Sequence, residues 1–76
     1  MQIRERDLMG GLAKGLSVIE AFSAERQRLS ISEAAEIAGL DRATARRCLL
    51  TLSELGYARY DGKYFELTPR ILRLGN

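Results

Sequence analysis

Three arginines stand close together in the segment RATARRCLL, and their spacing fits one side of a short helix: Arg42, Arg46 and Arg47. A guanidinium group offers its N–H donors in a planar fork, which matches both a phosphate group and the O6/N7 edge of guanine. This pattern therefore indicates a surface for a polyanion such as double-stranded DNA. Arginines on a helix most often form only a solvated surface, so the surrounding elements must decide between the two interpretations.

Those elements predict a helix-turn-helix. Ser32 is a candidate N-cap for a helix that ends near Ala38, and Gly39 follows at the position where glycine commonly terminates a helix. Asp41 is expected to cap the next helix, which runs to about Leu55. In a helix-turn-helix, the amino-terminal half of the second helix enters the major groove. This position favours DNA recognition over a solvated surface.

Helical projection at about 100° per residue separates a core side of this helix from its arginine side. The core side is expected to hold Ala45, Cys48, Leu49, Leu52 and Leu55. The opposite side holds Ala43, Arg47, Leu50 and Glu54, flanked by Thr44 and Arg46. Three roles stay open for Leu50: exposure to solvent, packing under the following segment, or contact with a second subunit.

The segment YARYDGKYFEL predicts a β-hairpin at residues 57–67. Asp61-Gly62 between two strand-like runs favours a two-residue type I′ turn. The expected cross-strand pairs are Tyr60 with Lys63, Arg59 with Tyr64, and Ala58 with Phe65. Alternation turns Ala58, Phe65 and Leu67 toward the core. It leaves Arg59 and Lys63 near each other at the tip, where they suit phosphates or a narrow minor groove.

The remaining elements complete the order of a winged helix-turn-helix, mainly α with a small β-hairpin. A first helix is expected from Leu12, with Leu12, Leu16, Ile19 and Phe22 on one side and Val18 beside them. Residues 1–11 are expected to form a mobile arm, and residues 29–31 a very short strand or extended lead-in. Thr68-Pro69 is a helix start, with threonine as the N-cap and proline in the first turn.

Composition limits the class of protein. The chain has 76 residues, no histidine, one cysteine (Cys48) and a net charge of only +2. One small domain is expected, with Cys48 in the core and no disulfide, metal site, cofactor or catalytic residue. No apolar run approaches the length of a membrane span, so a cytoplasmic location is expected.

Two stretches resemble the DNA-binding domain of IclR-type bacterial transcriptional regulators: GLAKGLSVIEAF and LSISEAAEIAGLDRATARRCLLTLSELGYARYDGKYFELTPRILRLG. Within the family, the chain looks most like regulators of aromatic-acid catabolism, the protocatechuate and hydroxybenzoate group. The resemblance implies an arm at 1–11 and a winged helix-turn-helix at 12–75. The helix-turn-helix would span about 31–55, the wing about 57–67, and the start of a linker helix about 69–75.

The resemblance also implies a homodimer, at least on DNA, that binds an inverted-repeat operator as a repressor or an activator. Family members carry a larger effector-binding domain, which is absent here, so we expect an isolated domain without its own effector pocket. The contacting residues carried over by position are Arg42, Ala43, Thr44, Arg46 and Arg47 on the third helix, with Ser32, Arg59 and Lys63 on the DNA backbone. Ala43 departs from the family, in which many members have serine.

Two alternatives remain beside DNA recognition. A winged helix can serve protein–protein contact, but that use predicts an apolar or acidic third helix, which the three arginines oppose. An enzyme is disfavoured because the chain has no histidine and no glycine-rich phosphate loop. Whether Arg46 or Arg47 reads guanine is left open, and Arg42 is assigned to a phosphate contact or a surface charge.

Overall fold

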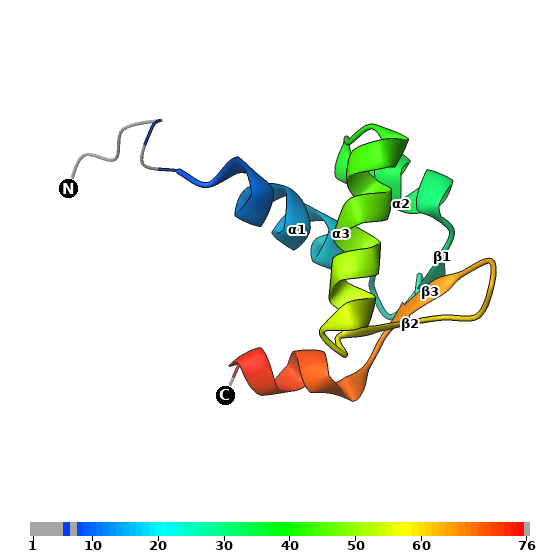
Figure 1. Ribbon diagram of the computed structural model, residues 1–76. Helices are drawn as coiled ribbons and strands as arrows, with labels where there is room; N and C mark the ends of the chain where they lie inside the picture. Colours follow the sequence, from blue (N-terminus) through cyan, green and yellow to red (C-terminus); the bar gives the residue numbers. More distant parts are fainter. Residues whose placement is uncertain (1–5, 7, 76) are drawn as a thin grey trace.

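Figure 1 shows the computed structural model of the protein, which describes residue 6 and residues 8–75. Three α-helices pack together, and a small antiparallel sheet lies beside them (Figure 1). The hairpin of this sheet extends to the side opposite the start of the first helix. The observed elements confirm a mainly α fold with a small β-hairpin.

The first helix, α1 (Gly10–Ala21), packs through its second half, where Val18 and Ala21 are buried. Leu12 and Leu16, which were predicted to share one side of this helix with Ile19 and Phe22, are 59% and 50% exposed. The first half of α1 extends beyond the other helices, which leaves these two leucines exposed (Figure 1). Residues 10 and 11 belong to the helix rather than to the predicted arm, and residues 1–5 and 7 of that arm lie outside the described residues.

The second helix, α2 (Ile31–Ala38), is stabilised at both ends by local sequence. Ser30, not Ser32, is the N-cap: its Oγ accepts from the Glu33 backbone N–H at 3.2 Å, and Glu33 Oε1 accepts from the Ser30 N–H at 2.9 Å. This reciprocal capping needs a glutamate three residues after the cap, and a cap at Ser32 would meet Ala35 there. At the other end Gly39 adopts a φ of 73°, which glycine tolerates best.

The third helix, α3 (Arg42–Glu54), follows Asp41, whose carboxylate accepts from the Thr44 N–H at 3.2 Å. The predicted cap is confirmed. Ala45 and Leu49 are fully buried, and Cys48 and Leu52 pack against the core as expected. Leu55 was expected inside but is 55% exposed, because the helix ends at Glu54 and helical projection no longer applies. Leu50, whose position was open, is 39% exposed.

The sheet consists of β1 (Arg28–Leu29), β2 (Ala58–Tyr60) and β3 (Phe65–Leu67), with β3 in the middle. The predicted extended segment at 29–31 is thus a strand one residue earlier, and Ile31 already belongs to α2. The hairpin pairs are Ala58 with Leu67, Arg59 with Glu66, and Tyr60 with Phe65. The predicted register was therefore wrong by two residues.

A four-residue turn explains the shifted register. A type I′ turn needs positive φ at both central residues, but in this turn only Gly62 has positive φ, at 104°. Asp61 Oδ1 instead accepts from the N–H groups of Lys63 at 2.9 Å and Tyr64 at 2.8 Å. Because the shift is an even number, side chains keep their predicted faces, and Ala58 and Phe65 are buried.

The core gathers one small set of side chains around the middle strand. It contains Val18, Ala21, Leu29, Ala34, Leu49 and Phe65. Phe65, Leu49 and Val18 are the largest fully buried side chains. The core therefore ties α1, α2 and α3 to the hairpin.

The last element is a 3-10 helix, η2 (Pro69–Gly75), so a helix begins after Thr68 as predicted, although it is tighter than an α-helix. The Thr68 hydroxyl donates to the Gly56 carbonyl at 2.7 Å instead of capping the helix. This bond joins the end of the hairpin to the end of α3, where Gly56 has a φ of 89°.

Candidate nucleic-acid interface

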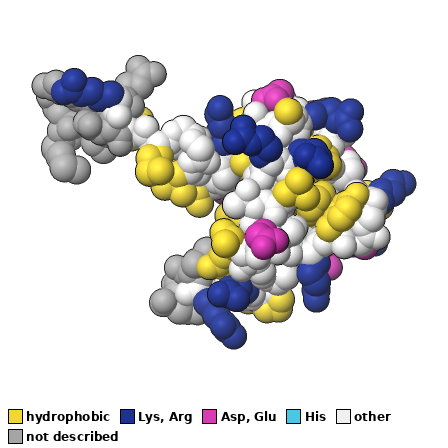
Figure 2. Space-filling model, viewed as in Figure 1, with side chains coloured by type: hydrophobic (Ala, Val, Ile, Leu, Met, Phe, Trp, Pro, Cys, Tyr) yellow, Lys and Arg dark blue, Asp and Glu magenta, His cyan; other side chains and the backbone are white. Residues whose placement is uncertain are grey.

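Exposed cations gather on the amino-terminal half of α3. Arg42, Arg46 and Arg47 are all exposed, and none of them forms an ion pair with any other residue that the structure describes. Figure 2 shows Lys and Arg side chains over this half of the helix. The opposite side carries the buried Ala45 and Leu49. The helix therefore presents three guanidinium groups to solvent from a backbone fixed by the core.

Asp41, the N-cap of α3, accepts two hydrogen bonds from Thr44. The Thr44 hydroxyl donates to Asp41 Oδ1 at 2.5 Å, and the Thr44 backbone N–H also bonds this carboxylate. These two bonds hold the pKa of Asp41 below its ordinary value of 3.8, so the cap is ionised at neutral pH. The negative charge suits the positive end of the helix dipole. Thr44 is half-buried and its hydroxyl proton is used in the cap, whereas Ala43 beside it is exposed.

The positive charge of Lys63 in the hairpin turn acts on the first turn of α2. Hydrogen bonds with Ser30 hold the pKa of Glu33 below its ordinary value, and the positive charge of Lys63 adds to this effect. Ser32 is exposed in the first turn of α2. Ser32 and Lys63 therefore flank the same end of the helix-turn-helix.

Arg59 is not placed as predicted. The observed register sets it opposite Glu66, with Arg59 Nη2 at 3.5 Å from Glu66 Oε1, while Lys63 lies in the turn with Nζ 5.2 Å from the centre of the Tyr64 ring. Both members of the Arg59–Glu66 pair are substantially exposed. Exposed pairs contribute at most about 1 kcal/mol, so a phosphate can compete for this arginine.

The tyrosines of the hairpin region are engaged within the protein. Tyr60 stacks on Phe65 with ring centres 4.4 Å apart, and Tyr57 lies under the guanidinium of Arg70 at 5.4 Å. Tyr64 contacts the cationic groups of Arg28 and Lys63. All three rings are thus in contact with other side chains of the same chain.

Lys14 is a cation beside α3 whose position no sequence pattern indicated. It lies in α1 and lines a groove against α3 together with Thr44, Arg47 and Cys48. Its charge also contributes to the lowered pKa of Asp41, after the Thr44 hydrogen bonds. No local pattern joins Lys14 to residues about thirty positions later, and only the packing of α1 on α3 reveals the proximity.

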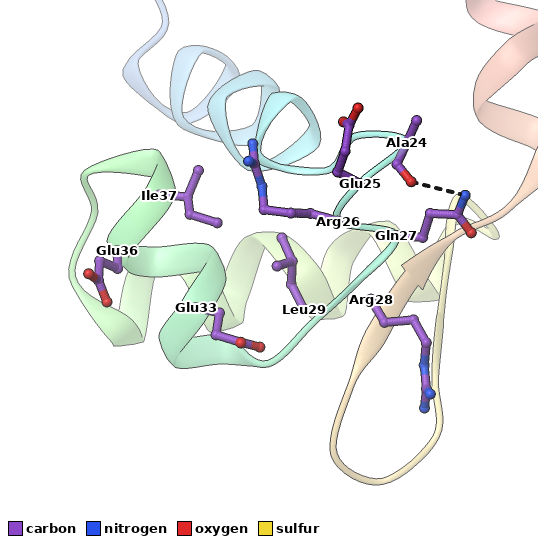
Figure 3. A pocket seen from close by; sticks show the side chains of 9 residues that line it. All are labelled: Ala24, Glu25, Arg26, Gln27, Arg28, Leu29, Glu33, Glu36 and Ile37. Carbon is purple, nitrogen blue, oxygen red and sulfur yellow. Dashed lines mark hydrogen bonds between the residues drawn. The ribbon is translucent and has the colours of Figure 1, made fainter.

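A second groove lies between α2 and the segment that joins α1 to β1 (Figure 3). Its lining carries both signs of charge, from Glu25, Glu33, Glu36, Arg26 and Arg28. Three carboxylates outnumber two guanidinium groups in this groove, so it suits a phosphate backbone less well than the first half of α3 does.

A metal site and a membrane-spanning helix are two features that the described part of the chain does not contain. This part holds no group of three potential metal ligands, and none of its helices is long and apolar enough to cross a membrane. The Cys48 thiol is free and half-buried.

Two crossed helices, an exposed cationic second helix and an adjoining hairpin define a winged helix-turn-helix, a class of DNA-binding domain. Residues 11–62 match the IclR helix-turn-helix domain. The chain therefore belongs to the IclR family of transcriptional regulators, which are not enzymes, and comprises its DNA-binding domain.

Individual relatives agree with this assignment. The chain is 51% identical over 71 residues to the Pca operon regulatory protein of Acinetobacter baylyi, covering 93% of this chain and 26% of that protein. It is 49% identical over 75 residues to the p-hydroxybenzoate hydroxylase transcriptional activator of the same organism, covering 99% of this chain and 28% of that protein. A crystal structure of a Rhodococcus transcriptional regulator superposes with a TM-score of 0.86 at 53% identity, covering 90% of this chain and 27% of that one. The chain thus spans about a quarter of the length of these relatives.

Proposed function

We propose that this domain belongs to a bacterial regulator that binds an inverted-repeat operator and controls genes of aromatic-acid catabolism. The observation that carries the proposal is the exposed arginine surface on the first half of α3, which forms no ion pair with the residues that the structure describes. The link to aromatic acids rests on one relative that activates transcription of p-hydroxybenzoate hydroxylase and another that regulates the Pca operon.

In the proposed complex α3 enters the major groove. Arg46 or Arg47 makes a bidentate contact with guanine, and Arg42 contacts a phosphate. Ala43 and Thr44 lie along the same groove wall, where the Thr44 methyl group is the part left to meet a base. Ser32, Arg59 and Lys63 hold the DNA backbone on either side, and Lys14 adds a cation beside Arg47.

Salt dependence tests whether these cations neutralise phosphates. If four or five do so, the logarithm of the association constant should fall by roughly 4 for each tenfold rise in salt, because about 0.9 counterion is released per contact. An operator is first obtained by selection from random duplexes with the purified domain, and fluorescence anisotropy then gives affinity at several salt concentrations. A flat salt response would contradict the proposal.

An apolar stripe on α1 supports the proposed homodimer. Leu8 and Met9, just before α1, are 62% and 71% exposed, and Leu12 and Leu16, about one turn apart in α1, are 59% and 50% exposed. Figure 2 shows hydrophobic side chains along this part of the molecule. Two half-sites about one helical turn apart need two modules related by a two-fold axis. We therefore assign the stripe to contact with a second copy of the chain.

Replacing Leu12 and Leu16 with serine should weaken binding to the full operator by about 100-fold, because the second module would lose its high effective concentration. Affinity for a single half-site should stay unchanged, which is the internal control. Light scattering with and without operator would show whether the unmodified domain pairs in solution or only on DNA. Equal losses on the full site and the half-site would argue against this interface.

The proposal extends to parts of the regulator beyond this chain. A small aromatic acid would act through an effector-binding domain of the kind that IclR regulators carry, and the protein would work in the cytoplasm. Whether it activates or represses is a property of that larger protein.

A further inference from the structure

One cation outside the helix-turn-helix is bound to the hairpin turn. Arg28 in β1 pairs with Asp61, 33 residues away, through Nη2 and Oδ2. Its guanidinium also lies 5.0 Å from the centre of the Tyr64 ring. In Figure 3 the Arg28 side chain points along the hairpin. The arginine therefore contacts both ends of the four-residue turn.

Asp61 organises that turn. Its Oδ1 accepts from the N–H groups of Lys63 and Tyr64, and its own N–H donates to the Tyr64 carbonyl at 3.0 Å. The Tyr64 and Lys63 N–H groups, with Arg28 adding to them, hold the pKa of Asp61 below its ordinary value of 3.8. The carboxylate is thus charged at neutral pH, and its second oxygen is directed to Arg28.

Within the described residues, Arg28 is the only partner outside the hairpin that hydrogen-bonds the turn at 61–64. The turn lies beyond the last strand pair, Tyr60 with Phe65, so the bond with Arg28 is what joins the tip to β1. Lys63, the cation proposed to grip the DNA backbone, sits inside this turn. Its backbone N–H is bonded to the same aspartate that binds Arg28.

We propose that Arg28 is a positioning residue for DNA binding, which fixes the wing turn through Asp61 and Tyr64 so that Lys63 meets its phosphate. The inference rests on the proposed function, because it assigns a role within the same interface. In this role the positive charge of Arg28 is paired with Asp61, and Arg28 does not itself neutralise a phosphate. The alternative, in which Arg28 is one more phosphate contact, makes opposite predictions for two variants.

The first test uses Asp61→Asn. The asparagine carbonyl oxygen can still accept from the Lys63 and Tyr64 N–H groups, so this change removes mainly the ion pair with Arg28. It also removes a negative charge, which by itself favours binding to a polyanion. A positioning role predicts weaker operator binding despite this gain in net charge. Stronger binding would mean that the gain in net charge, or contact of the released Arg28 with DNA, outweighs any loss of positioning, and it would overturn the inference.

The second test is additivity between Arg28→Gln and Lys63→Ala. Losing one phosphate contact lowers the salt slope of operator binding by about 1. If Arg28 acts through Lys63, each single variant and the double variant should all lower the slope by about 1. Independent phosphate contacts would lower it by about 2 in the double variant, and an unchanged slope in Arg28→Gln would also refute the positioning role.

Controls separate this inference from the fold and from the proposed function. Arg73→Gln removes the same charge from an exposed position in η2 and should leave the slope unchanged. Thermal unfolding by circular dichroism should show similar midpoints for all variants, because the changed side chains are exposed. If the unmodified domain binds no selected duplex, the proposed function fails; if it binds but the variants behave independently, only the role of Arg28 fails.

Discussion

Replacing both Arg46 and Arg47 with alanine should reduce operator affinity at least roughly 30-fold, since each lost base or phosphate contact of this kind costs about 1–3 kcal/mol. The domain should remain folded. Both side chains are exposed, and alanine is favourable within a helix. Fluorescence anisotropy on the selected operator would measure the loss, with circular dichroism to confirm folding. Single variants tested on operators with altered guanines would show which arginine reads a base.

A matched double variant, Arg26→Ala with Arg73→Ala, controls for net charge. It also removes two exposed positive charges, but from the segment before β1 and from η2. Its effect on affinity should be much smaller, because only the general attraction between protein and DNA changes. Equal losses in the two double variants would mean that total charge, and not the α3 surface, drives binding. Full affinity after loss of Arg46 and Arg47 would mean that a surface other than this half of α3 binds the DNA.

Replacing Phe65 with alanine should lower the free energy of unfolding by about 3–5 kcal/mol. Phe65 is fully buried on the middle strand and belongs to the core cluster that joins the hairpin to the helices. A domain of this size is expected to have only about 4–11 kcal/mol of stability, so this loss is a substantial fraction of the total. Urea unfolding followed by circular dichroism would give the change.

Two graded controls accompany this measurement. Phe65→Leu keeps most of the apolar volume and should cost clearly less, while Lys63→Ala in the exposed turn should change stability by no more than about 0.5 kcal/mol. A loss below about 1 kcal/mol in Phe65→Ala would mean that the hairpin adds little to the core. DNA binding by this variant should fall along with its folded fraction.

Local sequence was sufficient where one residue controls one structural feature. Asp41 was predicted as the cap of α3, and Gly39 as the end of α2, because cap and terminator preferences depend on neighbouring residues. The buried side of α3 also followed from its period, as Ala45 and Leu49 show. The same logic failed at Ser32, where the competing Ser30–Glu33 capping box was overlooked.

Residue preferences were not sufficient where two segments compete for the same atoms. Asp61-Gly62 favours a type I′ turn, yet the Asp61 carboxylate binds two N–H groups of the turn and Arg28 from another strand. The turn lengthens, the register moves by two residues, and Arg59 meets Glu66 instead of Tyr64. The exposure of Leu12 and Leu16 likewise depends on how far α1 extends beyond its neighbours.

The sequence by itself determined the helices, the hairpin, the core side of α3 and the cluster of arginines opposite it. Hydrophobic periodicity and capping depend on only a few neighbouring residues, so both can be recognised in the sequence alone. Tertiary structure alone decided that Lys14 lies beside Arg47 and that Arg28 binds the turn around Lys63. Those contacts join residues about thirty positions apart, and they form only because packing of the core brings distant segments into reach.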